Sequence, residues 1–219
     1  MNDLEFLTWV RGPALGFAIS IFLLGLIWRL IEVFSLGRKK DLSAPRFRSG
    51  ASGWHTIVRR SFAHELHTPA VLVSYVGGYV FHIGFFVVVL FFAPHIQLFK
   101  YAFGLSWPGL PSRLVDFIAV ITILAMVIVL ADRITKKVKR YLSNFGDYFA
   151  WAITFLPVLT GWMAVQHLML PYTRMLAIHI LCVEIFLVFF PFTKLLHGFA
   201  TFGARWYNGD LNGRKGVPV

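Results

Sequence analysis

The chain has 219 residues, of which 58% are hydrophobic and only 14% are charged. A soluble domain of this length needs far more polar surface, so the composition argues against that class of protein. The formal net charge is +11, and its meaning depends on where the basic residues lie.

The apolar residues fall into five runs, each long enough to cross about 30 Å of hydrocarbon as a helix. The sequence therefore predicts an all-α integral membrane protein, with one domain over residues 1–219 that forms a bundle of five transmembrane helices. Five buried helices of a soluble core are the alternative, but the connections are too short to supply a polar shell. The predicted helices cover residues 15–34, 70–93, 114–130, 148–168 and 175–192.

The basic residues lie mostly on one side of the predicted bundle. Residues 37–69, residues 131–147, the tail from Thr193 and Arg29 together hold 17 of the 21 Lys and Arg residues, which leaves 4 for the other side. Positive charge stays in the cytoplasm during insertion, so we expect a multi-pass protein of the cell inner membrane with its N-terminus outside. The C-terminus and the basic loop 37–69 are then cytoplasmic. Anionic lipid headgroups are the expected partners of these charges, and nucleic acid is not.

The chain has one cysteine, Cys182, inside the last apolar run. A single cysteine excludes an internal disulfide, a cysteine-ligated iron–sulfur cluster and a Cys-x-x-Cys-His haem attachment site. Any redox centre in this chain must therefore be held by other ligands.

Five of the eight histidines lie in apolar runs or at their ends, where a polar side chain needs a partner. A lone histidine in a membrane usually forms a hydrogen bond between helices, so the pattern matters more than any one residue. His179 and His197 are eighteen residues apart. On one continuous helix this separation is five turns, so the two residues would lie on the same face about 27 Å apart along the axis. One ligand for each of two stacked haems has this spacing. The other histidines of this kind are His82, His95 and His167.

The second predicted helix runs antiparallel to the fifth and could supply the opposite ligands. His82 can meet His197 if the two helices are tilted or staggered. His95 comes thirteen residues later, about 20 Å further along a continuous helix, which brings it towards the depth of His179.

Two motifs carry a resemblance to a known family. "FHIG" at 81–84, and "FPFTKLLH" at 190–197 with a histidine eighteen residues upstream of its own, resemble the respiratory nitrate reductase gamma subunit. They also resemble the cytochrome b subunits of sulfite-reductase-associated and heterodisulfide-reductase-like complexes. The resemblance implies a five-helix anchor with two haems b that reacts with quinol. It implies that His82 and His197 ligate the haem near the cytoplasm, where an iron–sulfur subunit docks, and that His179 ligates the distal haem.

The sequence departs from this family at one ligand. The family places a second histidine ten residues after the first on the second helix, and here that position is Phe92, which cannot ligate iron. His95 follows Pro94, which is expected to end or kink the helix and let His95 turn inward. His167 is the competing ligand, and the absence of a distal haem is the third alternative.

Glu184 is the one acidic residue within the last apolar run. A carboxylate in lipid must be paired, protonated or linked to water. Three roles stay open for it: a proton relay, a partner of a ligand imidazole, or a hydrogen bond across the bundle.

The function expected from the resemblance is electron transfer between the quinone pool and a cytoplasmic iron–sulfur partner of a respiratory oxidoreductase. The chain would then be the quinol or quinone oxidoreductase membrane subunit of a larger enzyme. A proton-conducting transporter and a cofactor-free membrane anchor are the alternatives. Broken half-helices and paired sequence halves would favour a transporter, and the sequence has neither.

Overall fold

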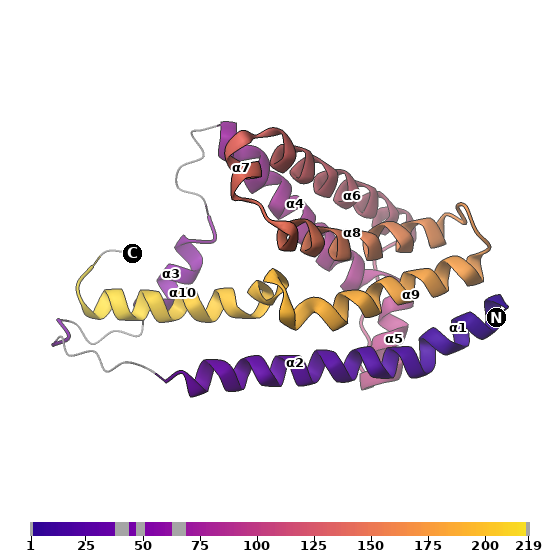
Figure 1. The fold of residues 1–219 in the computed structure, drawn as a ribbon, viewed down its shortest axis with the longest axis horizontal. Helices are drawn as coiled ribbons and strands as arrows, with labels where there is room; N and C mark the ends of the chain where they lie inside the picture. Colours follow the sequence, from indigo (N-terminus) through magenta and orange to yellow (C-terminus); the bar gives the residue numbers. More distant parts are fainter. Residues whose placement is uncertain (1, 38–43, 47–50, 63–68, 218–219) are drawn as a thin grey trace.

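The computed structural model describes residues 2–37, 44–46, 51–62 and 69–217, and all regular structure within those ranges is helical (Figure 1). Five of its helices are long and apolar enough to cross a membrane. The prediction of an all-helical protein with five possible spans is therefore confirmed. These spans are Asp3–Ser35, Val71–Phe91, Ser112–Thr135, Phe145–Val165 and Tyr172–Phe192.

The first span begins well before the predicted residue 15. It consists of α1 (Asp3–Trp9), a π-helical turn (Val10–Ala14) and α2 (Leu15–Ser35). The side chain of Asn2 accepts a hydrogen bond from the Glu5 N–H, and this capping box starts α1. The π-helical turn contains Pro13, which has no N–H to donate to the preceding turn.

The second span ends at a proline, as the sequence predicts. α4 covers Pro69–Phe91, Phe92 has an extended backbone, and α5 (Ala93–Phe103) starts again with Pro94 in its first turn. Pro94 suits that position because the N–H groups of a first helical turn need no partner within the helix. α5 then leaves the bundle as a separate projection (Figure 1).

The third and fourth spans lie side by side. α6 (Ser112–Thr135) leads through the short α7 (Lys137–Leu142) into α8 (Phe145–Val165). Asp132, near the end of α6, is buried and accepts hydrogen bonds from Ser74 of α4 and Lys139 of α7. This polar cluster joins three helices at one end of the bundle.

The fifth span corrects one prediction. α9 (Tyr172–Phe189) is followed by two short 3₁₀ turns, Phe190–Phe192 and Lys194–Leu196, with an extended Thr193 between them. His179 and His197 therefore do not lie on one continuous helix, and the five-turn count between them is wrong. The physical cause is Pro191, which cannot continue the hydrogen-bond ladder of α9.

His197 is the first residue of a helix in the tail, α10 (His197–Arg214), which the apolar pattern did not predict. α10 packs against α3 (Ala51–Arg59), the helix within the predicted basic loop. Glycines allow this close approach: a Cβ at Gly53 would lie 2.7 Å from Trp206 Cδ1, and one at Gly209 would overlap Thr56. The parts of the predicted loop at 38–43, 47–50 and 63–68 lie outside the described residues.

The spans form two packed groups. α4 packs against α6, while α9 packs against α8 and α2, and α6 against α8 joins the two groups. α2 and α9 run in the same direction, and α4 is inclined to both (Figure 1). We call the end of the bundle that carries the N-terminus the N-side and the opposite end, which carries α10, the C-side.

Candidate functional site

The structure brings four histidines together as two pairs, one towards each end of the bundle. The C-side pair is His82 of α4 and His197 of α10, whose ring centroids are 6.0 Å apart with planes at 87°. The inclination of α4 lets His82 reach His197, although the two lie at different distances from the ends of their helices. The juxtaposition of these two residues is the one that the sequence favoured.

The N-side pair is His95 of α5 and His179 of α9, with ring centroids 6.3 Å apart and planes at 22°. The helix is interrupted at Phe92, where the backbone is extended. This interruption turns α5 away from the axis of α4 and brings His95 to His179. Phe92 itself lies against His95, with ring centroids 5.4 Å apart. The residue at the expected ligand position thus packs beside the histidine that comes three residues later.

All four imidazoles share one hydrogen-bonding pattern. In each ring Nδ1 lies within 3.1 Å of a backbone carbonyl oxygen, and a neutral imidazole can donate its N–H there. Such a bond sets the tautomer and leaves the lone pair of Nε2 free for a metal, as is usual for metal-bound histidines. The carbonyls belong to Gly78 for His82, Val88 for His95, Pro157 for His179 and Lys194 for His197.

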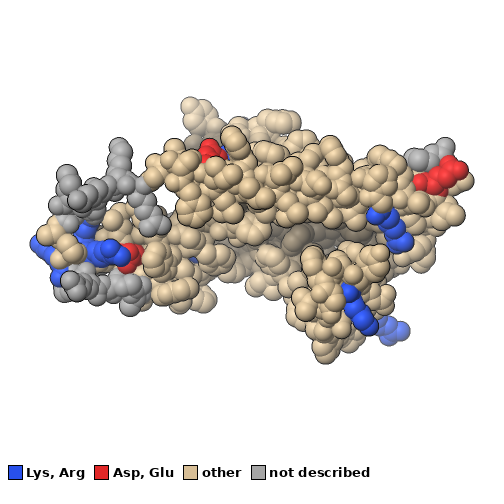
Figure 2. Space-filling model, turned by 90° about the horizontal axis from the view of Figure 1, so that it is seen from below, with Lys and Arg blue, Asp and Glu red and all other residues tan. Residues whose placement is uncertain are grey.

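The surroundings of the two pairs differ. His82 and His197 are exposed, whereas His95 and His179 are half-buried. Burial lowers the pKa of His95 below its usual range, which keeps the imidazole neutral and able to bind a metal. The surface is hollowed beside the α5 projection when the molecule is seen from below (Figure 2).

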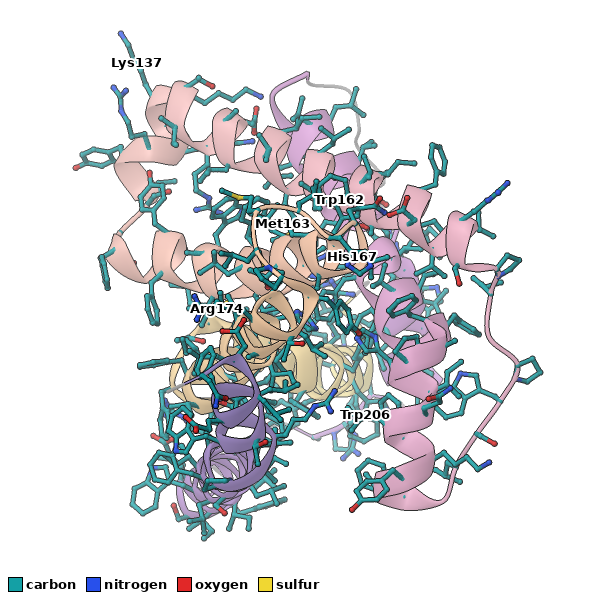
Figure 3. The ribbon with its side chains drawn as sticks, turned by 90° about the vertical axis from the view of Figure 1, so that its right-hand side faces the viewer. Lys137, Trp162, Met163, His167, Arg174 and Trp206 are labelled. Atoms are coloured by element: carbon teal, nitrogen blue, oxygen red, sulfur yellow. The ribbon has the colours of Figure 1, made fainter. Side chains whose placement is uncertain are left out.

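His167, the competing candidate, joins neither pair. It follows the end of α8 with a left-handed backbone (φ 54°), is exposed, and lies against Tyr172 with ring centroids 5.4 Å apart. Figure 3 looks onto this end of the bundle and labels His167 with Trp162 and Met163 of α8. Of the two residues considered as the partner of His179, only His95 is in contact with it.

Gly161 of α8 leaves room for the His179 ring. A Cβ at this position would lie 2.9 Å from His179 Cε1 and 3.1 Å from Nδ1, which is too close for either atom to stay in place. The same ring is 3.4 Å from the Thr160 hydroxyl. Residues 157–161 of α8 therefore position the His179 ring. The Pro157 carbonyl and the Thr160 hydroxyl lie beside it, and Gly161 leaves space for it.

Trp107 supports the N-side pair from outside, which the sequence did not reveal. Its indole Nε1–H donates to the Leu90 carbonyl, and the Leu110 N–H donates to the Phe91 carbonyl. Both carbonyls lie in the last turn of α4, where the break at Phe92 and Pro94 removes their helical donors. The loop 104–111 rises outside α5 towards α6 (Figure 3). An aromatic residue next to Pro and Gly was the available signal, but it equally suits an interfacial belt.

The geometry can be tested against a haem. A bond between an imidazole nitrogen and a metal is about 2 Å long, so two rings on opposite sides of one metal have centroids roughly 6 Å apart. Both pairs have this spacing. Within the described residues no three His, Cys, Asp or Glu side chains gather as a metal site. Two histidines with free Nε2 atoms suit an iron whose other four ligands belong to a porphyrin.

Comparison with known proteins gives a relative. A protein of Nitratidesulfovibrio vulgaris (strain Hildenborough) is 36% identical over 199 residues, which is 86% of this chain and 85% of that protein. This chain belongs to the same family. No protein-family model and no solved structure matches the chain. The comparison therefore establishes the relationship, and the chemistry is inferred from the histidines.

Proposed function

We propose that this chain is a membrane subunit that binds two haems b and transfers electrons between the quinone pool and a cytoplasmic iron–sulfur partner of a respiratory oxidoreductase. The observation that carries the proposal is the four-histidine pattern: two pairs at ligand spacing, each Nδ1 at a backbone carbonyl. The motifs that resemble the nitrate reductase gamma subunit contribute three of these histidines, and the Pro94 break contributes the fourth.

The residues have separate tasks in this proposal. His82 and His197 would hold one haem, and His95 and His179 would hold the other. When bound, haem b supplies reversible one-electron transfer. The backbone carbonyls orient the four rings and raise the basicity of Nε2, and the apolar helices around them keep the buried side chains away from water.

The proposed orientation is N-side outside and C-side in the cytoplasm of a cell with an inner membrane. The 17-to-4 split of basic residues supports it. A C-terminal fusion to alkaline phosphatase tests it, because that enzyme is active only in the periplasm. An inactive fusion agrees with the proposal, and an active one reverses the orientation.

The experiment that tests the function is a reduced-minus-oxidised absorption spectrum of the purified protein, taken before and after a quinol analogue is added. Haem b bands that quinol reduces are the expected result. A protein that takes up no haem under conditions that load other b cytochromes would favour the cofactor-free anchor. If the haem bands are present, the proteins that co-purify with the chain identify the catalytic partner.

A further inference from the structure

Glu184 is an acidic side chain buried inside α9 that the proposed ligand set does not use. It is 4% exposed, and its Oε1 has no hydrogen-bond partner. An ionised carboxylate without a partner is strongly disfavoured in apolar surroundings. A buried polar atom without a partner also destabilises the fold, so its presence needs an explanation.

Glu184 follows His179 by five residues on α9, about 140° around the helix axis, so it does not share the face that carries His179 to α8. The other helix packed against α9 and the turn after it is α2. Pro191 lies against Gly25, where a Cβ would be 2.7 Å from Pro191 Cβ. Seven residues before Gly25 on the parallel α2 comes Ala18, which is 1% exposed. No side chain of α2 donates a hydrogen bond to Glu184 Oε1.

The neighbouring helices hold no charge at this depth. Residues 15–28 of α2 and 149–165 of α8 contain no ionisable side chain, and α9 contributes His179 and Cys182. The charged and titratable groups of the packed elements lie towards the two ends of the bundle. They are Asp3, Glu5, Arg11, Tyr172 and the Asp3 partner Arg174 on the N-side, and Arg29, Glu32, Asp147 and Tyr148 on the C-side.

Glu184 also lies between the depths of the two histidine pairs. It follows His179 by five residues, about 7.5 Å along the axis of α9, and it precedes His197. Charges in a low-dielectric interior interact over such distances with little screening by salt. A change of charge at the N-side pair therefore changes the electrostatic potential at this carboxyl group.

Resting on the proposed function, we propose that Glu184 is a proton-binding site whose occupancy follows the charge at the N-side pair. A ferric haem between the two neutral imidazoles would carry one net positive charge, which would favour the ionised carboxylate; if one electron from quinol cancelled that charge, the Glu184 carboxylate would bind one proton from the aqueous phase and form an O–H bond. The proton dissociates when the electron leaves. The site thus keeps the interior near constant charge while electrons pass through it.

Redox titration of the purified haem-loaded protein at several pH values tests this site. For a one-electron couple a tenfold change in proton activity corresponds to about 59 mV. We expect the midpoint potential of one haem to fall with pH, by up to about 59 mV per pH unit. Glu184→Gln, which keeps the shape and cannot ionise, should flatten that slope. The control Glu32→Gln, at the exposed end of α2, should keep it.

The outcomes separate this inference from the function it rests on. A wild-type chain without haem overturns the proposed function. A chain with two haems whose pH slope is the same in wild type and Glu184→Gln overturns the proton site alone.

A second measurement needs no variant that might fail to fold. The infrared difference spectrum between the reduced and oxidised wild-type protein should contain the carbonyl band of a protonated carboxylic acid, shifted in heavy water. If the difference spectrum of the wild type contains no such band, the proton site is excluded, whatever the results for the variants.

Discussion

The two histidine pairs offer the same ligands but are held in different ways. The N-side pair is half-buried, and α8 and the loop 104–111 support it from two directions. The C-side pair is exposed. Each of its rings forms a hydrogen bond with a carbonyl three or four residues earlier in the chain, in α4 for His82 and at the start of α10 for His197. The difference shows that a similar spacing of two imidazoles can come from tertiary support at one end of a bundle and from local backbone at the other.

The largest expected effect is the loss of one haem at a time. His197→Ala should remove the C-side haem and leave the N-side haem intact, because the two pairs share no residue. His95→Ala should do the reverse. Absorption spectra of the purified variants measure both, and His167→Ala serves as the matched control that keeps two haems. If His167→Ala loses the N-side haem and His95→Ala keeps it, the assignment of His95 is wrong.

Gly161→Ala should weaken the N-side site without removing a ligand. The added methyl group would lie 2.9 Å from His179 Cε1, so the ring must move away from the Pro157 carbonyl. We expect haem to be retained roughly tenfold less tightly at this site, or about 1.4 kcal/mol, measured by transfer of haem to an acceptor protein. Gly16→Ala is the control, since a Cβ there meets nothing within 4 Å. Equal retention in both variants would remove Gly161 from the account.

Trp107→Phe should have a smaller effect, confined to the same pair. It removes the N–H that bonds the Leu90 carbonyl but keeps the aromatic bulk, which costs about 1 kcal/mol. A several-fold faster loss of the N-side haem is expected, while the C-side haem stays unchanged. Tyr101→Phe, at a position that is 91% exposed, is the control. An equal effect on both haems would mean that Trp107 acts on the whole bundle.

The smallest expected effect is a spectroscopic difference between the two haems of the wild-type protein. Ring planes at 87° in the C-side pair and 22° in the N-side pair predict two unlike low-spin ferric signals by electron paramagnetic resonance. The near-perpendicular pair should give the more anisotropic signal, and this signal should disappear in His197→Ala. Two identical signals would show that binding rotates the rings to a common arrangement.

The sequence predicted the spans because each is a long apolar run, and apart from the start of the first span their observed bounds lie within about five residues of the predicted ones. It also predicted the break at Pro94, since a proline lacks the N–H that continues a helix. It did not reveal α10, whose glycines disfavour a helix in isolation; two of them, Gly209 and Gly213, pack closely against α3. Pro191 signalled the break after Phe189, but the contact of His197 with His82 depends on how the chain then turns into α10, which the sequence does not show.

The four candidate histidines were visible because polar residues are rare in apolar runs. Their carbonyl partners were not, since the bond from His179 to Pro157 joins residues 22 positions apart on different helices. The hydrogen bond of Trp107 was not predictable for the same reason: its partner, Leu90, lies 17 residues away across a break.

The central claim is that this chain holds two haems through two separate histidine pairs. A pyridine haemochrome assay on the purified protein, with its concentration fixed by amino-acid analysis, counts the haems directly. The account predicts two haems b per chain in the wild type and one in either His95→Ala or His197→Ala. A wild-type value of one that falls to zero in His197→Ala and stays at one in His95→Ala would contradict the N-side site, and a wild-type value of zero would contradict the whole account.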